Sequence, residues 1–199
     1  MSADKTNRPP NFSSDVEKYG AWGESLFEKH YEKAFKKKGY TLFNVSKIKE
    51  YQDEDIDFVI AKYQAEDPDT PVNEMSLILG GGDNFEKVEV KVDTRTIDTG
   101  NIPYEMISHG QLGWSLRTKC DKVFFIIAKE EGDTLTPIRG HWIVTDNWHE
   151  FIADRSKNKI SNLIKSERGI ADLLCKESDM LDSGVITSTT VFKKAPDVE

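Results

Sequence analysis

The apolar positions in residues 15–38 recur at the spacing of one face of an α-helix. These positions are Trp22, Leu26, Phe27, Tyr31, Ala34 and Phe35. A capping-box pattern at residues 14–17 precedes them, and Gly39 follows as a C-cap. The pattern predicts a helix over residues 15–38, in which Gly20 and Gly23 mark a kink or a close approach to a neighbouring element.

Apolar runs after this helix predict a β-sheet. The expected strands cover residues 40–45, 56–61, 86–92, 101–108, 122–128, 138–145 and 185–192. The run 122–128 is apolar almost throughout, which is typical of a central strand that is covered on both faces. A second helix is expected from residue 145 or 146 to about 154, and short helical pieces over 156–182. A helix first and then strands indicates an α/β protein with a mixed sheet.

The chain of 199 residues suits a single domain, which we expect over residues 13–192. Residues 1–12 and 193–199 are predicted to be flexible tails. Residues 64–84 contain several prolines, aspartates and glycines, which indicates an inserted connection. There is no apolar stretch typical of a membrane span or a secretory signal, so no membrane partner and a cytoplasmic protein are expected.

The formal net charge of −8 bears on which partners the chain can bind. A DNA-binding protein usually presents a basic face, because neutralised phosphates drive the affinity, so this charge counts against strong general DNA binding. The one dense basic run is Lys36–Lys38. Two interpretations of it stay open, contact with phosphates and a helix end favoured by the helix dipole. Trp142 is interpreted as a core anchor or as a residue that stacks on bases.

The expected strand at 86–92 carries charge on one face. Glu89 and Lys91 lie two residues apart and therefore share a face, opposite Val88, Val90 and Val92. One interpretation is an edge strand whose polar face is in water. The other is a catalytic site, because two carboxylates and a lysine can support metal-dependent phosphodiester hydrolysis. Asp57 and Glu89 would then be metal ligands together with the carbonyl of Val90, and Lys91 would position water or stabilise charge.

Asp57 followed by Glu89-Val90-Lys91 resembles the PD-(D/E)xK nuclease superfamily. Trp22-Gly23-Glu24, Gly39-Tyr40 and Asp55-Ile56-Asp57 precede the Glu-Val-Lys strand in the order of resolvase-like members. Thr99-Gly100-Asn101, Glu105, Gly113-Trp114 and Lys119-Cys120-Asp121 are similar to a subgroup common among phage and bacterial proteins. The resemblance covers residues 20–128. The chain departs from the pattern because Ile56 stands before Asp57, where the family motif has proline, and because residues 64–84 lengthen the connection.

The resemblance implies a restriction-endonuclease-like fold and a Mg²⁺-dependent endonuclease that acts on DNA, with Mn²⁺ as an alternative ion. It implies that Glu24 joins the catalytic residues near the metal, although an ordinary exposed helix glutamate is the other interpretation. Asp55 shares a face with Asp57 and is a substitute for it. Lys119 and Asn101 are the implied substrate contacts. A homodimer and a bacterial or phage origin are further expectations.

A second functional class is kept beside the nuclease. The same fold can act as an inactive or weakly active binding module that engages a protein partner, and the negative charge motivates this hypothesis. The presence of both Glu89 and Lys91 counts against it, since a binding module has no need of the pair.

Overall fold

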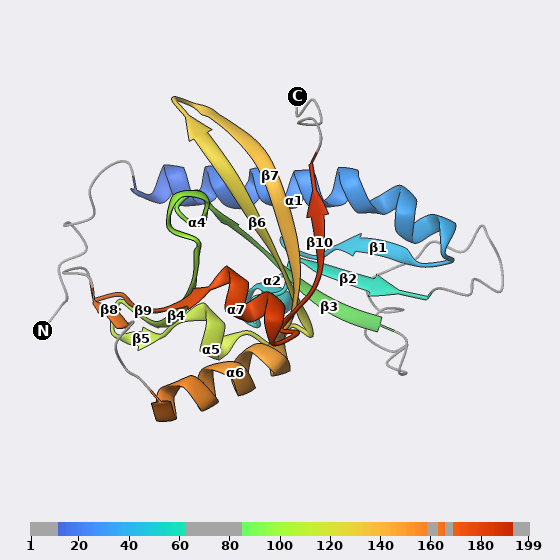
Figure 1. Ribbon diagram of the computed structural model, residues 1–199. Helices are drawn as coiled ribbons and strands as arrows, with labels where there is room; N and C mark the ends of the chain where they lie inside the picture. The colour runs from blue at the N-terminus through green and yellow to red at the C-terminus, as the bar shows by residue number, and fades with distance from the viewer. Residues whose placement is uncertain (1–11, 63–84, 159–162, 166–168, 193–199) are drawn as a thin grey trace, which may run out of the picture.

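The computed structural model describes residues 12–62, 85–158, 163–165 and 169–192 (Figure 1). The expected tails lie outside the described residues apart from Phe12, and so does the insertion at 64–84. No helix within the described part of the chain is long and apolar enough to cross a membrane.

A six-stranded sheet in the order β1-β2-β3-β6-β7-β10 forms the centre of the fold. Its strands are β1 (Thr41–Asn44), β2 (Phe58–Ala61), β3 (Phe85–Asp93), β6 (Lys122–Glu131), β7 (Thr134–Val144) and β10 (Ile186–Val191). β3 and β6 pair in parallel, and the other neighbours pair antiparallel. The expectation of a mixed sheet, with the apolar run at 122–128 in a central strand, is confirmed.

The first helix, α1 (Phe12–Lys37), covers one face of this sheet (Figure 1). Leu26 and Phe27 are fully buried against apolar side chains of β2, β3 and β6. A Cβ atom at Gly23 would lie 2.4 Å from the Cγ2 atom of Val92. The helix therefore approaches β3 closely at Gly23, which confirms the second of the two roles predicted for this glycine.

The strand at 101–108 belongs to a second sheet, so the prediction that it continues the main sheet is wrong. This sheet has the order β5-β4-β9-β8. Its strands are β5 (Gln111–Leu112), β4 (Asn101–Ser108), β9 (Ala171–Lys176) and β8 (Leu163–Lys165). The apolar pattern of 101–108 defines which face is buried, but not which strand is the neighbour.

The short helical pieces expected over 156–182 are only partly correct. α7 (Glu177–Asp182) is helical, but β8 and β9 are strands. In β9 the buried residues Ala171, Leu173 and Cys175 alternate with half-buried ones, which is the period of a strand. A run of only six residues shows this period too briefly to exclude a helix from sequence alone.

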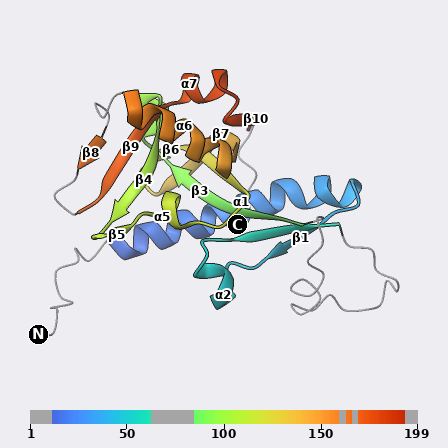
Figure 2. The same cartoon turned by 90° about the horizontal axis from the view of Figure 1, so that it is seen from below.

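The face of the main sheet opposite α1 is covered by the second sheet and by α6 (Thr145–Asn158), as Figures 1 and 2 show. Trp148 and Ile152 of α6 pack there in the larger of two apolar clusters. The short helices α2 (Lys49–Gln52), α4 (Thr96–Thr99) and α5 (Trp114–Arg117) connect the strands. The chain is thus a mixed α/β protein whose mostly antiparallel sheet is flanked by helices.

The contact at Gly23 predicts a difference between two glycines of one helix. Gly23→Ala forces Val92 to move and should lower the free energy of unfolding by about 1–3 kcal/mol. Gly20→Ala meets no atom within 4 Å and should raise it by about 0.5–1 kcal/mol, because alanine favours the helix. Urea unfolding of both variants measures the two changes. Equal stabilisation by both would contradict the close approach of α1 to β3.

Candidate functional site

The candidate site lies where β2 diverges from β3. Phe58 pairs with Val88, and the N–H of Asp57 donates to the Val88 carbonyl at 3.0 Å. Before Asp57 the chain turns away towards α2, whereas β3 continues to Asp93. The Asp57 carboxylate accepts a hydrogen bond from the N–H of Val90 at 2.8 Å, where a neighbouring strand would otherwise supply the acceptor. The carbonyl of Val90 lies on the same edge of the strand, so both groups face the notch between the two strands.

Glu89 and Lys91 lie side by side on the face of β3 that points away from α1. Glu89 is only 3% exposed, and its Oε1 atom forms an ion pair with Nζ of Lys91. No donor from the described residues reaches Oε2 of Glu89, which is also buried. Asp57 and Glu89 are close enough for their carboxyl groups to hydrogen-bond. Three residues predicted for catalysis therefore converge on one buried position.

Burial dominates the electrostatics of this site. It raises the pKa of Glu89 to about 8, although the charge of Lys91 acts in the opposite direction. Burial also raises the pKa of Asp57. The neighbouring Glu89 carboxylate keeps the pKa of Lys91 above its usual range despite burial. Burial thus makes the charged form of Glu89 costly, and the charge of Lys91 offsets part of that cost.

Glu24 reaches the same site from α1. It follows Gly23, the residue at which the helix comes close to β3, and it is half-buried rather than exposed. Burial raises the pKa of Glu24, while a hydrogen bond with the Ser46 side chain lowers it. The charges of Asp57 and Lys91 also act on its pKa, so these side chains are electrostatic neighbours. Glu24 therefore lies at the margin of the site, within electrostatic range of Asp57 and Lys91. We call Asp57, Glu89 and Lys91, with Glu24 at their margin, the carboxylate site.

Two residues of α5 border this site, and the sequence patterns gave neither of them a role. The ring of Trp114 lies 4.9 Å from Nζ of Lys91, which is a cation–π distance. Arg117 donates to Asp55 through Nε at 2.7 Å and Nη2 at 2.8 Å. Asp55, the expected substitute for Asp57, is turned towards this arginine in a left-handed backbone conformation with φ of 53°.

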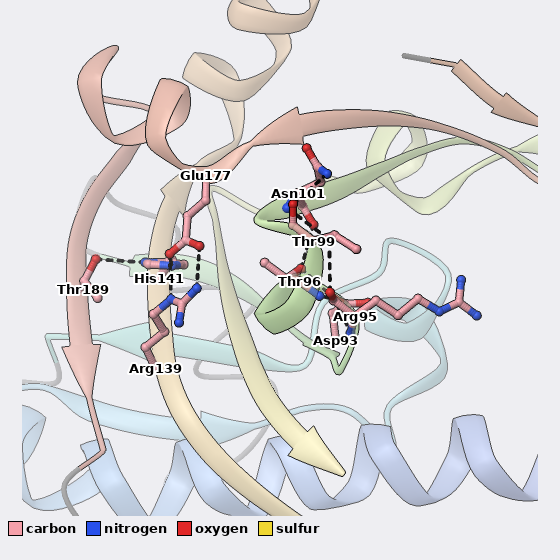
Figure 3. A network of polar contacts seen from close by, with 9 residues as sticks. All are labelled: Asp93, Arg95, Thr96, Thr99, Asn101, Arg139, His141, Glu177 and Thr189. Carbon is pink, nitrogen blue, oxygen red and sulfur yellow. Dashed lines mark hydrogen bonds and ion pairs between the residues drawn. The ribbon is translucent and has the colours of Figure 1, made fainter.

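The two predicted substrate contacts lie outside the carboxylate site. Lys119 is exposed and donates to Oε1 of Glu54 at 3.1 Å. Asn101 donates from Nδ2 to the carbonyl of Thr99 at 3.0 Å, in the turn after α4 that Figure 3 shows. Lys119 nevertheless lies close to Arg117. The N–H of Lys119 donates to the carbonyl of Glu54, and the next residue, Asp55, is the partner of Arg117.

A second polar network surrounds Glu177 at the start of α7 (Figure 3). Its carboxylate accepts from Nε and Nη2 of Arg139 at 2.6 and 2.5 Å, and lies 2.8 Å from Nε2 of His141. Nδ1 of His141 lies 2.8 Å from the Thr189 hydroxyl. Burial lowers the pKa of His141, whereas the neighbouring Glu177 carboxylate acts in the opposite direction. These contacts hold α7 against β7 and β10.

The donor atoms of the carboxylate site suit a hard cation. In the described ranges, no group of three or more His, Cys, Asp or Glu side chains is placed to hold a metal ion. The available ligands are the carboxylates of Asp57 and Glu89 and the carbonyl of Val90. Mg²⁺ commonly binds through one or two carboxylates and keeps several waters, so these oxygens fit Mg²⁺. The buried Oε2 atom of Glu89, which lacks a donor, supports this fit.

The raised pKa of Glu89 predicts how stability changes with pH. Between the ordinary value of 4.5 and the folded value of about 8, the folded chain binds more protons than the unfolded chain. In EDTA the free energy of unfolding should therefore fall as pH rises through this window, by at most about 1.4 kcal/mol per pH unit from this group. Glu89→Gln should flatten that slope. Urea unfolding from about pH 5 to about pH 9 tests this, and identical slopes for parent and variant would contradict it.

Comparisons of the chain with models of protein families, with curated proteins and with solved structures found no match. The functional argument therefore rests on the residues of the carboxylate site and their geometry.

Proposed function

We propose that the chain is a Mg²⁺-dependent endonuclease of restriction-endonuclease-like fold that hydrolyses phosphodiester bonds of DNA at the carboxylate site. One observation carries this proposal. Glu89 is buried, no donor among the described residues reaches its Oε2 atom, and the carboxyl group of Asp57 and the ammonium group of Lys91 lie beside it. Burying such a group is costly unless a positive partner compensates for it, which indicates that the arrangement is kept for binding a cation.

Asp57, Glu89 and the Val90 carbonyl would hold the ion, and Glu24 would bind one of its waters. The ion, when bound, lowers the pKa of water and neutralises charge on the phosphate. The positive charge of the ion would also favour the charged form of Glu89, which burial alone disfavours. Asp57 keeps its Oδ2 atom on the N–H of Val90, which fixes the direction of its carboxylate.

Lys91 would act on the substrate. Its side chain is 29% exposed, so the ammonium group can reach solvent while it contacts Glu89. It can donate a hydrogen bond to the attacking water or to a phosphate oxygen as negative charge develops there. The Trp114 ring would help to hold Nζ in place, because the two are at a cation–π distance of 4.9 Å.

Arg117 and Lys119 provide the positive charge that a DNA phosphate needs near this site. Their side chains are 47% and 67% exposed. Both are paired with carboxylates, Asp55 and Glu54, in the absence of a ligand. This small basic rim is consistent with local phosphate contacts on a chain whose net charge is −8.

A second candidate function is a binding module that engages a protein partner. The ion pair of Lys91 with Glu89 favours it, because that pair occupies one of the proposed ligands. The two candidates differ in what they require. A binding module would not need Mg²⁺ or the charge of Lys91, whereas hydrolysis needs both.

The nuclease proposal predicts the effect of two isosteric variants. Asp57→Asn removes a ligand charge, and Lys91→Met removes the ammonium group. Each should lower Mg²⁺-dependent cleavage of labelled single-stranded, duplex and branched DNA by about 10²–10³-fold or more. Gel assays of purified proteins at equal concentration measure the rates, and urea unfolding shows whether each variant is folded.

Lys129→Met is the matched control, since Lys129 pairs with Glu131 on the far hairpin and is exposed. It should cleave as fast as the parent. If folded Asp57→Asn and Lys91→Met proteins cleave at the parent rate, or if the parent cleaves no DNA with Mg²⁺ or Mn²⁺, the proposal is wrong and the binding module is favoured.

A further inference from the structure

A groove lies at the C-terminal end of α1, beside Phe35 and Lys38. Figure 1 shows this end of the helix next to β1. Two hollows of about 360 and 450 Å³ form it, and both are lined by Phe35, Lys38, Glu86 and Lys122. Each falls within the range of roughly 300–1,000 Å³ that is usual for ligand sites. Because the two hollows share these four residues, we treat them as one lysine–aromatic groove.

Five aromatic side chains line the lysine–aromatic groove. They are Tyr31, Phe35, Tyr40, Phe85 and Trp142. The Tyr31 hydroxyl accepts from Nε1 of Trp142 at 2.9 Å and lies 2.7 Å from the Thr190 hydroxyl, so both rings are fixed. Tyr40 and Phe85 are 37% and 38% exposed, so these two rings are available for stacking.

The helix end itself places Tyr40 in this groove. Gly39 takes a φ of 78°, and the N–H of Tyr40 then donates to the carbonyl of Phe35 at 3.0 Å. Glycine is the residue that adopts this left-handed conformation without strain. The turn brings the tyrosine back beside the last turn of α1, where Lys38 also lies.

Lysines concentrate around the groove, although the chain as a whole is acidic. Lys36, Lys37 and Lys38 are exposed at the end of α1. Lys62 is exposed and follows Ala61, the residue that pairs with Phe85. Among the described lining residues, Lys38 and Lys122 are basic, and Glu86, which forms an ion pair with Lys122, is the one carboxylate. Together with Lys36, Lys37 and Lys62 outside the lining, this excess of lysine favours an anionic ligand.

We infer that the lysine–aromatic groove binds single-stranded nucleic acid, with bases stacked on the exposed rings and phosphates beside the lysines. Aromatic faces combined with a basic groove are how proteins bind single strands without reading their sequence. A duplex fits less well, because its bases are already stacked and paired. Of the two interpretations of Lys36–Lys38, phosphate contact is the one that the neighbouring rings support.

The groove cannot act on the phosphate that is cleaved at the carboxylate site. Glu24 and Lys38 lie on one helix and its C-terminal turn, and a rise of about 1.5 Å per residue separates them by roughly 20 Å. The inference therefore goes beyond the proposed nuclease activity and does not depend on it. Binding at the groove can be measured in EDTA, where no cleavage takes place.

Fluorescence anisotropy of a labelled oligothymidylate about twelve nucleotides long, at low salt and in EDTA, tests the inference. Tyr40→Ala and Phe85→Ala should each raise the Kd about 5-fold or more, because each removes a stacking surface. Lys38→Ala should weaken binding and lower the slope of log K against log salt by about 0.7. A duplex of the same length should bind more weakly than the single strand.

Leu181→Ala and Lys129→Ala are the matched controls, since both residues are exposed elsewhere on the fold. They should leave the Kd unchanged. Unchanged Kd in the folded groove variants would overturn the inference, and so would equal affinity for duplex. Displacement of the oligonucleotide by an acidic peptide at equal concentration would also overturn it, in favour of a protein ligand. Binding of the oligonucleotide by a parent protein that cleaves no DNA with Mg²⁺ would count against the nuclease proposal alone.

Discussion

The hydrogen bond from the Val90 N–H to the Asp57 carboxylate is the contact on which the carboxylate site depends. It lies where β2 leaves β3, and it replaces the backbone acceptor that a neighbouring strand would provide. The same carboxyl group is thereby fixed next to Glu89. A polar side chain thus completes the edge of a buried strand, and it brings backbone and carboxylate oxygens together beside that edge.

The carboxylate site lowers the stability of the fold, because it places an ionisable group in the interior. Glu89 pairs with Val123 of the apolar strand β6, and burial there makes its ionisation costly, as its raised pKa shows. Lys91 compensates for part of this cost, while Oε2 of Glu89 is left without a donor. Such an arrangement is expected where a protein keeps polar groups for a ligand rather than for folding.

The sequence predicted the elements that have a strong period of their own. Two such elements are the helix around Leu26 and Phe27 and the strand of Glu89 and Lys91. In each, apolar residues recur among polar ones with the period of the element over a sufficient length. Strand β9 is too short for that, and β4 pairs with it across a long stretch of chain. Arg117 and Asp55 could not be paired from sequence, because they are 62 residues apart and no local pattern connects them.

The course of α1 has a consequence for how the two sites relate. One unbroken helix carries Glu24 at its middle, held against β3 by Gly23, and Phe35 at its end, in the lysine–aromatic groove. A helix is a stiff spacer of fixed length, unlike a loop. If one nucleic-acid strand occupied both the groove and the carboxylate site, the length of α1 between them would fix the distance between its two bound segments. The number of helical turns would then determine which phosphate lies at the carboxylate site.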